Sequence, residues 1–131
     1  MITQRRKGAK NGEKNNMAKR KSASRVSDIR VVLVTAPPAE AEKLARKLLD
    51  ARLIACANLI PGVKSLYWWD GKINRDAETI IMMKTSKKNV TKLLARVKQL
   101  HSYSVPEFLT LKPMEGNPDY LAWVEKECSA R

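Results

Sequence analysis

The spacing of hydrophobic residues changes along the chain and predicts strands and helices in turn. Residues 30–36, RVVLVTA, form a β-branched apolar run that ends at Pro37-Pro38. This pattern predicts a buried strand followed by the first turn of a helix. Residues 39–51 then repeat apolar positions three and four apart, as one face of a helix does (Ala41, Leu44, Ala45 and Leu48).

A long hairpin is predicted next. Residues 53–69 indicate a strand, and Asp70-Gly71 follows as a two-residue turn, because a type I′ turn needs positive φ at both positions. Residues 72–85 return as the partner strand, and an apolar run on both of its faces predicts a central place in the sheet. Pro61-Gly62 interrupts the first strand and predicts a kink near a sheet edge.

The rest of the chain adds a helix, a strand and a helix. Ser86 is expected to cap a helix with apolar residues at Val90, Leu93, Leu94, Val97 and Leu100. Residues 107–113, EFLTLKP, predict a strand, and Asn117-Pro118 begins a last helix. The order is β-α-β-β-α-β plus one helix. It predicts an α+β, ferredoxin-like βαββαβ sandwich with an extra C-terminal helix and a long kinked β-hairpin.

The hairpin is too long for the body that carries it. The strand 53–69, if straight, would extend roughly 55 Å, whereas a compact domain of about 100 residues is only about 35 Å across. Its far end carries Leu66, Tyr67, Trp68 and Trp69, and a soluble monomer avoids exposing such a patch. We expect another copy of the chain to cover it. The alternatives are that the tip folds back onto its own sheet, or stays exposed with one tryptophan packed on Lys72.

Charge separates an N-terminal tail from the domain. The chain has 131 residues and a net charge of +13, and its first 30 residues contain 10 Lys/Arg and 2 Asp/Glu. We therefore expect residues 1–29 to be a basic disordered tail and residues 30–131 to be the single folded domain. The tail is a solvated extension, an arm for nucleic acid or an acidic surface, or a remnant of a targeting sequence.

Two cysteines 72 positions apart, Cys56 and Cys128, fit reduced thiols in an intracellular protein. No apolar run approaches the roughly 20 residues that cross a bilayer. We expect a cytoplasmic location, or an organellar one if the tail is a targeting remnant.

Five segments of the chain form a specific combination: VVLVTAP (31–37), ARLIACANLIPGVKSLYWWDGKI (51–73), ETIIMMKT (78–85), HSYSVPE (101–107) and GNPDYLAWV (116–124). Together they resemble the CutA family of divalent-cation tolerance proteins. The resemblance covers about residues 31–126. It implies a ferredoxin-like subunit, a homotrimer built by edge-to-edge strand pairing like the PII signalling proteins, tolerance of divalent metal ions such as copper, and no established enzymatic reaction.

Metal ligands are sparse. The chain has one histidine, His101, and no Cys-x-x-Cys or His-x-x-x-His spacing that would predict a structural zinc site. Family members linked to copper carry a cysteine and a His-His pair where this chain has Val34 and Leu100-His101. His101 and Cys56 are therefore weak candidates for copper or another divalent cation. His101 is otherwise a residue at a helix C-terminus, and Cys56 a small buried hydrophobe.

A polar and aromatic set resembles recurrent positions of the family, and strand ends of neighbouring subunits could gather it in an intersubunit cleft for a small anionic or polar ligand. The alternative is that these residues form salt bridges and hydrogen bonds at the subunit interface and only stabilise the trimer. The members are Lys64, Trp69, Lys84, His101, Tyr103, Glu107, Tyr120 and Trp123.

Two other functions have less support in the sequence. The first is an enzyme with Cys56 and His101 as nucleophile and base. The sequence shows no signature of an oxyanion hole or of a third catalytic residue, so we expect no catalytic residues. An RNA-recognition module would place aromatic residues on the strand 78–85, which has none, so nucleic-acid binding would depend on the basic tail alone.

Overall fold

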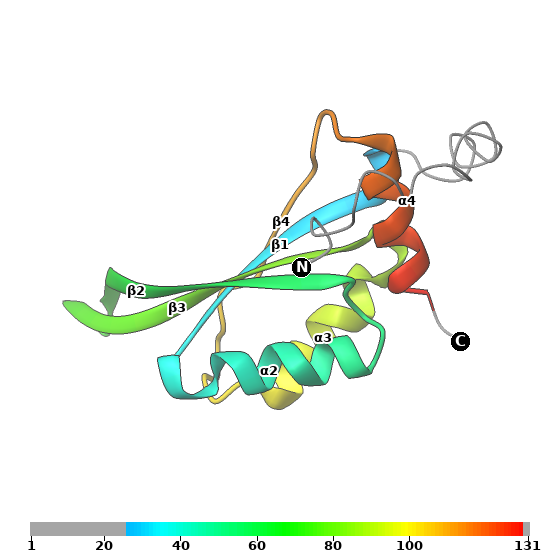
Figure 1. Cartoon of the computed structure of the whole chain (residues 1–131). Coiled ribbons are helices and arrows are strands. Elements are labelled where there is room, and N and C mark those ends of the chain that lie inside the picture. The colour runs from blue at the N-terminus through cyan, green and yellow to red at the C-terminus, as the bar shows by residue number, and fades with distance from the viewer. Residues whose placement is uncertain (1–25, 130–131) are drawn as a thin grey trace, which may run out of the picture.

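A computed structural model describes residues 26–129 (Figure 1). Most of the predicted tail, residues 1–25, lies outside this range. The described elements are a 3₁₀ turn (Val26–Asp28), β1 (Ile29–Ala36), α2 (Pro38–Asp50), β2 (Cys56–Trp69), β3 (Lys72–Ser86), a second 3₁₀ turn (Lys87–Asn89), α3 (Val90–Leu100), β4 (Leu109–Leu111) and α4 (Pro118–Glu127).

The four strands form one antiparallel sheet in the order β2-β3-β1-β4. β3 lies between β1 and β2, as expected for the split βαβ arrangement. Helices α2 and α3 cover one face of the sheet (Figure 1). The main core lies between these two helices and the sheet. It consists of apolar side chains from both layers, including Val32, Val34, Ile81, Met83, Leu44, Leu48, Leu93 and Val97. This confirms the predicted α+β ferredoxin-like sandwich.

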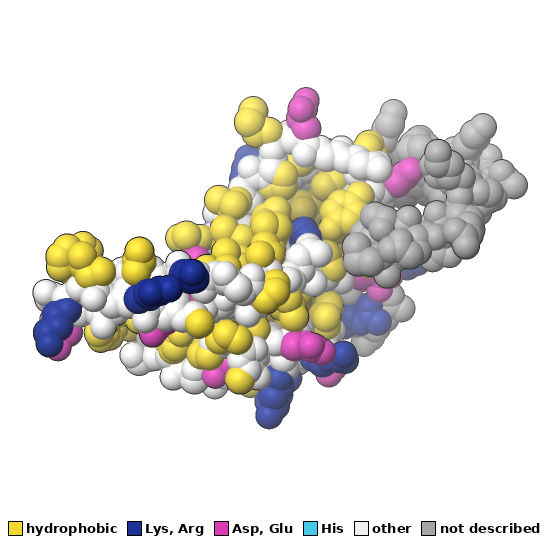
Figure 2. Space-filling view, turned by 60° about the vertical axis from the view of Figure 1, so that its left-hand side comes forward, with side chains coloured by type: hydrophobic (Ala, Val, Ile, Leu, Met, Phe, Trp, Pro, Cys, Tyr) yellow, Lys and Arg dark blue, Asp and Glu magenta, His cyan; other side chains and the backbone are white. Residues whose placement is uncertain are grey.

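The opposite face of the sheet, here called the open face, is only partly covered. α4 packs over one end of it through a second apolar cluster with Ile29 and Ala55. Elsewhere the alternation of β-strand side chains places apolar residues on this face, and no other element of residues 26–129 covers them. They include Val31, Leu33, Ile60, Met82, Leu109 and Leu111. Figure 2 shows hydrophobic side chains gathered over the centre of the molecule and out along the hairpin.

The hairpin has the predicted turn and kink. Asp70 and Gly71 both have positive φ, 55° and 74°, as the two-residue turn requires. Ile60 pairs with Ile80, but Val63 pairs with Glu78, so that Pro61 and Gly62 together face one residue of β3. This is a β-bulge. It confirms the kink predicted at this dipeptide.

Beyond the bulge, residues 63–78 form an arm that projects past the body of the subunit (Figure 1). Trp68 is 71% exposed and Leu66 68% exposed. The alternative in which the tip folds back onto its own sheet is therefore wrong. No helix of the described region is both long enough and apolar enough to span a membrane.

Some boundaries differ from the sequence-based expectation. The first hairpin strand begins at Cys56 instead of residue 53, because the chain turns at Arg52 with a φ of 59°. The last strand is reduced to Leu109–Leu111. Ser86 does not cap α3 through its side chain, because a 3₁₀ turn separates them. Asn117 does cap α4, since its Oδ1 accepts a hydrogen bond of 3.0 Å from the Asp119 backbone N–H.

The start of the folded domain also moves. We expected residue 30, but the first 3₁₀ turn begins at Val26 and β1 at Ile29. Ile29 is buried in the cluster under α4, so the domain begins before the expected boundary.

Candidate functional site

A surface pocket lies between the base of the arm and the loop that follows α3. We call it the arm cleft, and its volume is about 570 Å³. Pockets of 300–1,000 Å³ are usual for small-molecule sites. It is lined by Thr35, Ser65, Leu66, Tyr67, Trp69, Glu78 and residues 103–107.

Glu78 is the most deeply buried ionisable group of this cleft. It belongs to β3, pairs with Val63, the first residue of β2 after the bulge, and is only 6% exposed. Its Oε2 atom accepts a hydrogen bond of 2.8 Å from the Tyr103 hydroxyl. Burial, and then this hydrogen bond, raise the pKa of Tyr103 above its ordinary value. The hydroxyl therefore stays protonated and remains a donor to the carboxyl group.

His101 positions the loop that carries Tyr103. Its Nδ1 atom accepts a hydrogen bond of 3.0 Å from the Tyr103 backbone N–H, so Nε2 carries the ring proton. Nε2 lies 2.8 Å from the backbone oxygen of Thr35 and donates to it. The ring centroids of His101 and Tyr103 are 4.7 Å apart. The imidazole thus joins the loop to β1 and orients the tyrosine toward Glu78.

Two further contacts complete the cleft's frame. The Ser102 hydroxyl donates to Glu40 Oε1 over 2.8 Å and holds the loop to α2. On the arm, the Tyr67 hydroxyl donates to Asp76, and this hydrogen bond raises the pKa of Tyr67. Among the described residues that line the cleft, the ionisable acids are Glu78 and Glu107, and none is a lysine, an arginine or a histidine.

The predicted site residues therefore divide among several places. Trp69, Tyr103 and Glu107 line the arm cleft. Lys64 pairs with Ala77, so the alternation of β2 turns its side chain away from the side that carries Tyr67 and Trp69. Within one subunit the lining of the cleft is acidic and contains no lysine. The anionic ligand that Lys64 and Lys84 were expected to attract would therefore find no cation in this cleft.

Lys84, Cys56 and Tyr120 meet at the end of the open face under α4. Lys84 pairs with Cys56 across the strands, and its Nζ donates to Asn58 Oδ1. The Cys56 sulfur lies 3.5 Å from the Tyr120 hydroxyl. Burial, and then Cys56, raise the pKa of Tyr120. The Tyr120 ring stacks on Trp123 at 5.8 Å between centroids.

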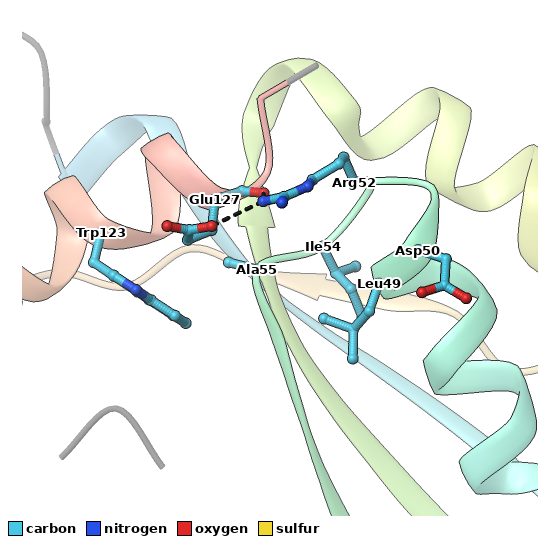
Figure 3. Close-up of a pocket in the computed structure, with 7 residues that line it drawn as sticks. All are labelled: Leu49, Asp50, Arg52, Ile54, Ala55, Trp123 and Glu127. Atoms are coloured by element: carbon cyan, nitrogen blue, oxygen red, sulfur yellow. Dashed lines mark hydrogen bonds and ion pairs between the residues drawn. The ribbon is translucent and has the colours of Figure 1, made fainter. Parts of the chain in front are cut away.

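Trp123 also lines the second pocket, of about 310 Å³ (Figure 3). Figure 3 shows Arg52 reaching from the loop after α2 toward Glu127 of α4. The guanidinium donates to Glu127 Oε1 over 2.8 Å and to the Glu127 backbone oxygen over 3.1 Å. These bonds attach to α4 the loop that turns at Arg52 with a φ of 59°.

The contacts do not favour His101 or Cys56 as metal ligands in one subunit. Both ring nitrogens of His101 are engaged in hydrogen bonds to the backbone. Val34 is fully buried in the main core and Leu100 packs against it, so the two departures from the copper-linked pattern are core residues. Within residues 26–129, no group of three or more His, Cys, Asp or Glu side chains is placed to hold a metal ion.

A catalytic Cys–His pair is not assembled either. Cys56 pairs with Lys84, whereas His101 bonds Thr35, which pairs with Ile80. Four positions along β3 correspond to about 13 Å. The two side chains therefore belong to different environments of the sheet.

The split βαβ sheet, the bulged arm and the half-covered open face define a ferredoxin-like subunit of the PII-like class. Comparisons with known proteins identify the family within that class. A model of the CutA1 divalent ion tolerance protein family matches residues 30–127. The chain therefore belongs to the CutA1 family.

Two curated relatives illustrate the similarity. The divalent-cation tolerance protein CutA of Thermus thermophilus is 43% identical over 97 residues, which is 73% of this chain and 94% of the relative. The protein called CutA 1, chloroplastic, of Oryza sativa subsp. japonica is 43% identical over 96 residues, which is 72% of this chain and 54% of the relative.

Solved structures agree on the fold. The divalent cation tolerance protein (Cut A1) of Thermus thermophilus superimposes with a TM-score of 0.74 at 41% identity, over 76% of this chain and 97% of that one. The PII-like protein CutA of Nostoc sp. PCC 7120 gives 0.73 at 33%, over 76% and 97%. The periplasmic divalent cation tolerance protein CutA of Archaeoglobus fulgidus gives 0.74 at 32%, over 77% and 99%.

Proposed function

We propose that this protein acts as a homotrimer in the tolerance of divalent metal ions, and that it holds a small ligand or a metal ion at clefts between subunits without catalysing a reaction. Family membership supports the metal-tolerance role, since the relatives are named for it. Copper or another divalent cation is the metal that the role would involve.

The exposed apolar surface of the single subunit carries the trimer proposal. Leu109, at 56% exposure, lies on the open face, and Trp68 lies at the far end of the arm. Fully burying one such side chain contributes about 1.5–3 kcal/mol. β2 and β4 are the outer strands of the sheet, so each presents an edge to which a neighbouring strand can be added.

The arm cleft is where a second subunit would complete a binding site. Trp69, Tyr103 and Glu107 form the part that one subunit supplies. Lys64, Lys84, Tyr120 and Trp123 lie outside that cleft, so we propose that they act at subunit contacts or reach a cleft of a neighbouring copy. If they only hold the trimer, the protein is a scaffold for a partner.

Light scattering coupled to gel filtration tests the assembly. We expect a mass of about three times the 14.8 kDa of the chain, and a monomer at all concentrations would overturn the proposal. The metal role is tested by expressing the chain in bacteria that lack their own CutA protein and are grown with copper. Restored growth supports the role, and sensitivity equal to the empty vector contradicts it.

Location and the tail are proposed on separate grounds. We propose a cytoplasmic protein, or an organellar one if residues 1–29 include a targeting remnant. The rice relative is named chloroplastic, which supports the second option, whereas the Archaeoglobus relative is named periplasmic. Fluorescent fusions of the full chain, and of the chain without residues 1–25, test the two options.

Charge favours a second candidate function for the tail. Ten Lys/Arg among the first 30 residues would bind nucleic acid or another acidic surface non-specifically and with strong salt dependence. Retention on a DNA or RNA column that is lost on removing residues 1–25 would support this function. Retention unchanged by the deletion would exclude it.

A further inference from the structure

Glu78 is a buried acid with little to balance its charge. Its side chain lines the arm cleft and is more than nine-tenths buried. Among residues 26–129 its one hydrogen-bond partner is the Tyr103 hydroxyl, which reaches Oε2, and no lysine, arginine or histidine forms an ion pair with it. A buried carboxylate with one neutral donor is poorly compensated, because buried charges are normally paired. The free oxygen, Oε1, remains available to a ligand.

The walls around Glu78 include two tyrosine rings. Tyr103 donates its hydroxyl to Glu78, and Tyr67 reaches Asp76, which lies two positions from Glu78 on β3. Trp69 also lines the cleft, but it pairs with Lys72, which is six positions or about 20 Å from Glu78 along β3. Aromatic faces attract cations through the ring quadrupole. A hard metal ion needs six or more oxygen ligands, whereas the lining offers two carboxyl groups, those of Glu78 and the exposed Glu107, beside hydroxyl groups.

We propose that the arm cleft binds an organic ammonium ion, the protonated amine of a small molecule, through Glu78 and the rings of Tyr67 and Tyr103, with Glu107 as a second carboxyl group. This inference rests on the proposed function, in which the cleft is a ligand site, and it gives the class of ligand. The ammonium N–H groups donate to the carboxylate oxygens and supply the positive charge that balances Glu78. The carbon chain of the amine packs against the tyrosine rings.

Three observations separate this ligand from its competitors. A carboxylate or phosphate would meet the two acids of the cleft and no lining cation. A neutral alcohol would leave the charge of Glu78 uncompensated. A divalent metal ion would find two carboxyl groups among aromatic walls, and no cluster of three acidic, His or Cys ligands exists in the described chain.

Nuclear magnetic resonance on the full-length protein tests the proposal. The ring signals of Tyr67 are assigned from their absence in Tyr67→Phe and followed during titration with propylammonium chloride. Propanol and sodium propionate are the neutral and anionic probes of matched size, and magnesium and copper chlorides are the metal probes. We expect a saturable shift with propylammonium alone.

Matched variants connect the shift to the acids. Glu78→Gln keeps an acceptor for Tyr103 but removes the charge, and we expect propylammonium to bind at least about tenfold more weakly, as for the loss of a hydrogen bond to a charged group. Glu107→Gln should show a smaller loss. Glu115→Gln, an exposed residue outside the cleft, should bind like the unaltered protein.

Each outcome decides the question. Equal affinities in Glu78→Gln and the unaltered protein, no saturable shift with propylammonium, or tighter binding of propionate or of a metal ion would overturn the inference. The mass of every sample is measured in parallel. Trimers that do not bind the amine refute this inference alone, whereas monomers refute the proposed assembly.

Discussion

The His101 Nε2 atom lies 2.8 Å from the backbone oxygen of Thr35, at the centre of the frame that holds the arm cleft. Because Nδ1 also accepts the Tyr103 backbone N–H, the imidazole is used at both ends within one subunit. The only histidine of the chain is therefore a positioning residue for the loop 101–107.

Replacing that histidine should affect stability and leave copper binding unchanged. His101→Ala leaves the Thr35 carbonyl and the Tyr103 N–H without their partner, and we expect a loss of about 1–3 kcal/mol in the free energy of unfolding. Denaturant unfolding at one fixed protein concentration measures the loss, because subunit association contributes to stability. The exposed Lys92→Ala serves as the control.

Calorimetry with copper on the same His101→Ala sample provides the second measurement. Equal copper affinities for the variant and the unaltered protein would support the prediction that the His101 imidazole forms hydrogen bonds within the subunit and does not bind copper. A loss of copper binding in the variant, without a change in trimer mass, would show that His101 is a ligand after all.

A charge on the open face should break the assembly. Leu109→Asp places a carboxylate where we propose that a neighbouring subunit packs, and removing an ion from water costs several kcal/mol. We expect the mass measured by light scattering to fall toward that of one chain. Met114→Asp is the matched control, since Met114 is 91% exposed and lies between β4 and α4. Trimers in both variants would argue against an interface at Leu109.

The hairpin turn should depend on Gly71 for its backbone alone. Its φ is 74°, and a Cβ atom would meet nothing within 4 Å. Gly71→Ala should therefore cost about 1–2 kcal/mol, the left-handed penalty of an L-residue. Gly71→Asn should cost less, because asparagine tolerates this region. Denaturant midpoints of the two variants give the comparison, and equal midpoints would contradict the assignment of the cost to φ.

Tyr103 should make the protein sensitive to alkaline pH. Its pKa is raised in the folded state, so above about pH 10 the unfolded chain releases a proton that the folded chain keeps. Stability then falls as pH rises past 10, because the folded state binds more protons. Absorbance at 295 nm should show tyrosine ionisation delayed in the native protein, and Tyr103→Phe should remove one tyrosine's share of the late part, because the pKa values of Tyr67 and Tyr120 are raised as well. An unchanged curve for the variant would refute the assignment.

Local signals in the sequence were enough for several elements. Asp70-Gly71 forms the predicted turn and Asn117 caps the predicted helix, because each depends on a few adjacent residues. Pro61-Gly62 forms the predicted bulge for the same reason. Such features require no knowledge of distant contacts.

The cleft itself was only partly predictable. Trp69, Tyr103 and Glu107 line one cleft of the single subunit, and the sequence does not point to Glu78 as their neighbour. In the sequence Glu78 is one polar residue at the start of an apolar strand, and its contact with Tyr103 of the loop 101–107 forms only in the fold. The alternation of polar positions in residues 72–78 was the available signal, but it does not say which side is covered.

Lys84 and Lys64 lie outside the cleft of one subunit. Their positions at or beside strand ends predict a place near a cleft between subunits, but strand ends alone do not specify a face of the sheet. Lys84 bonds Asn58 near Cys56, and Lys64 lies on the other side of the arm from Tyr67. The side of the arm on which Lys64 lies depends on how β2 and β3 pair beyond the bulge, and local sequence does not specify this pairing.

The bulge at Pro61-Gly62 gives the ribbon one spare residue, since these two residues of β2 face one residue of β3. Deletion of either residue would make the ladder regular and would leave Val63 opposite Glu78, so that Ser65, Tyr67 and Trp69 would keep their side. Deletion of both would shift the register by one residue and would bring Lys64, Leu66 and Trp68 to that side instead. The orientation of the ribbon thus tolerates the loss of one residue at this point but not of two.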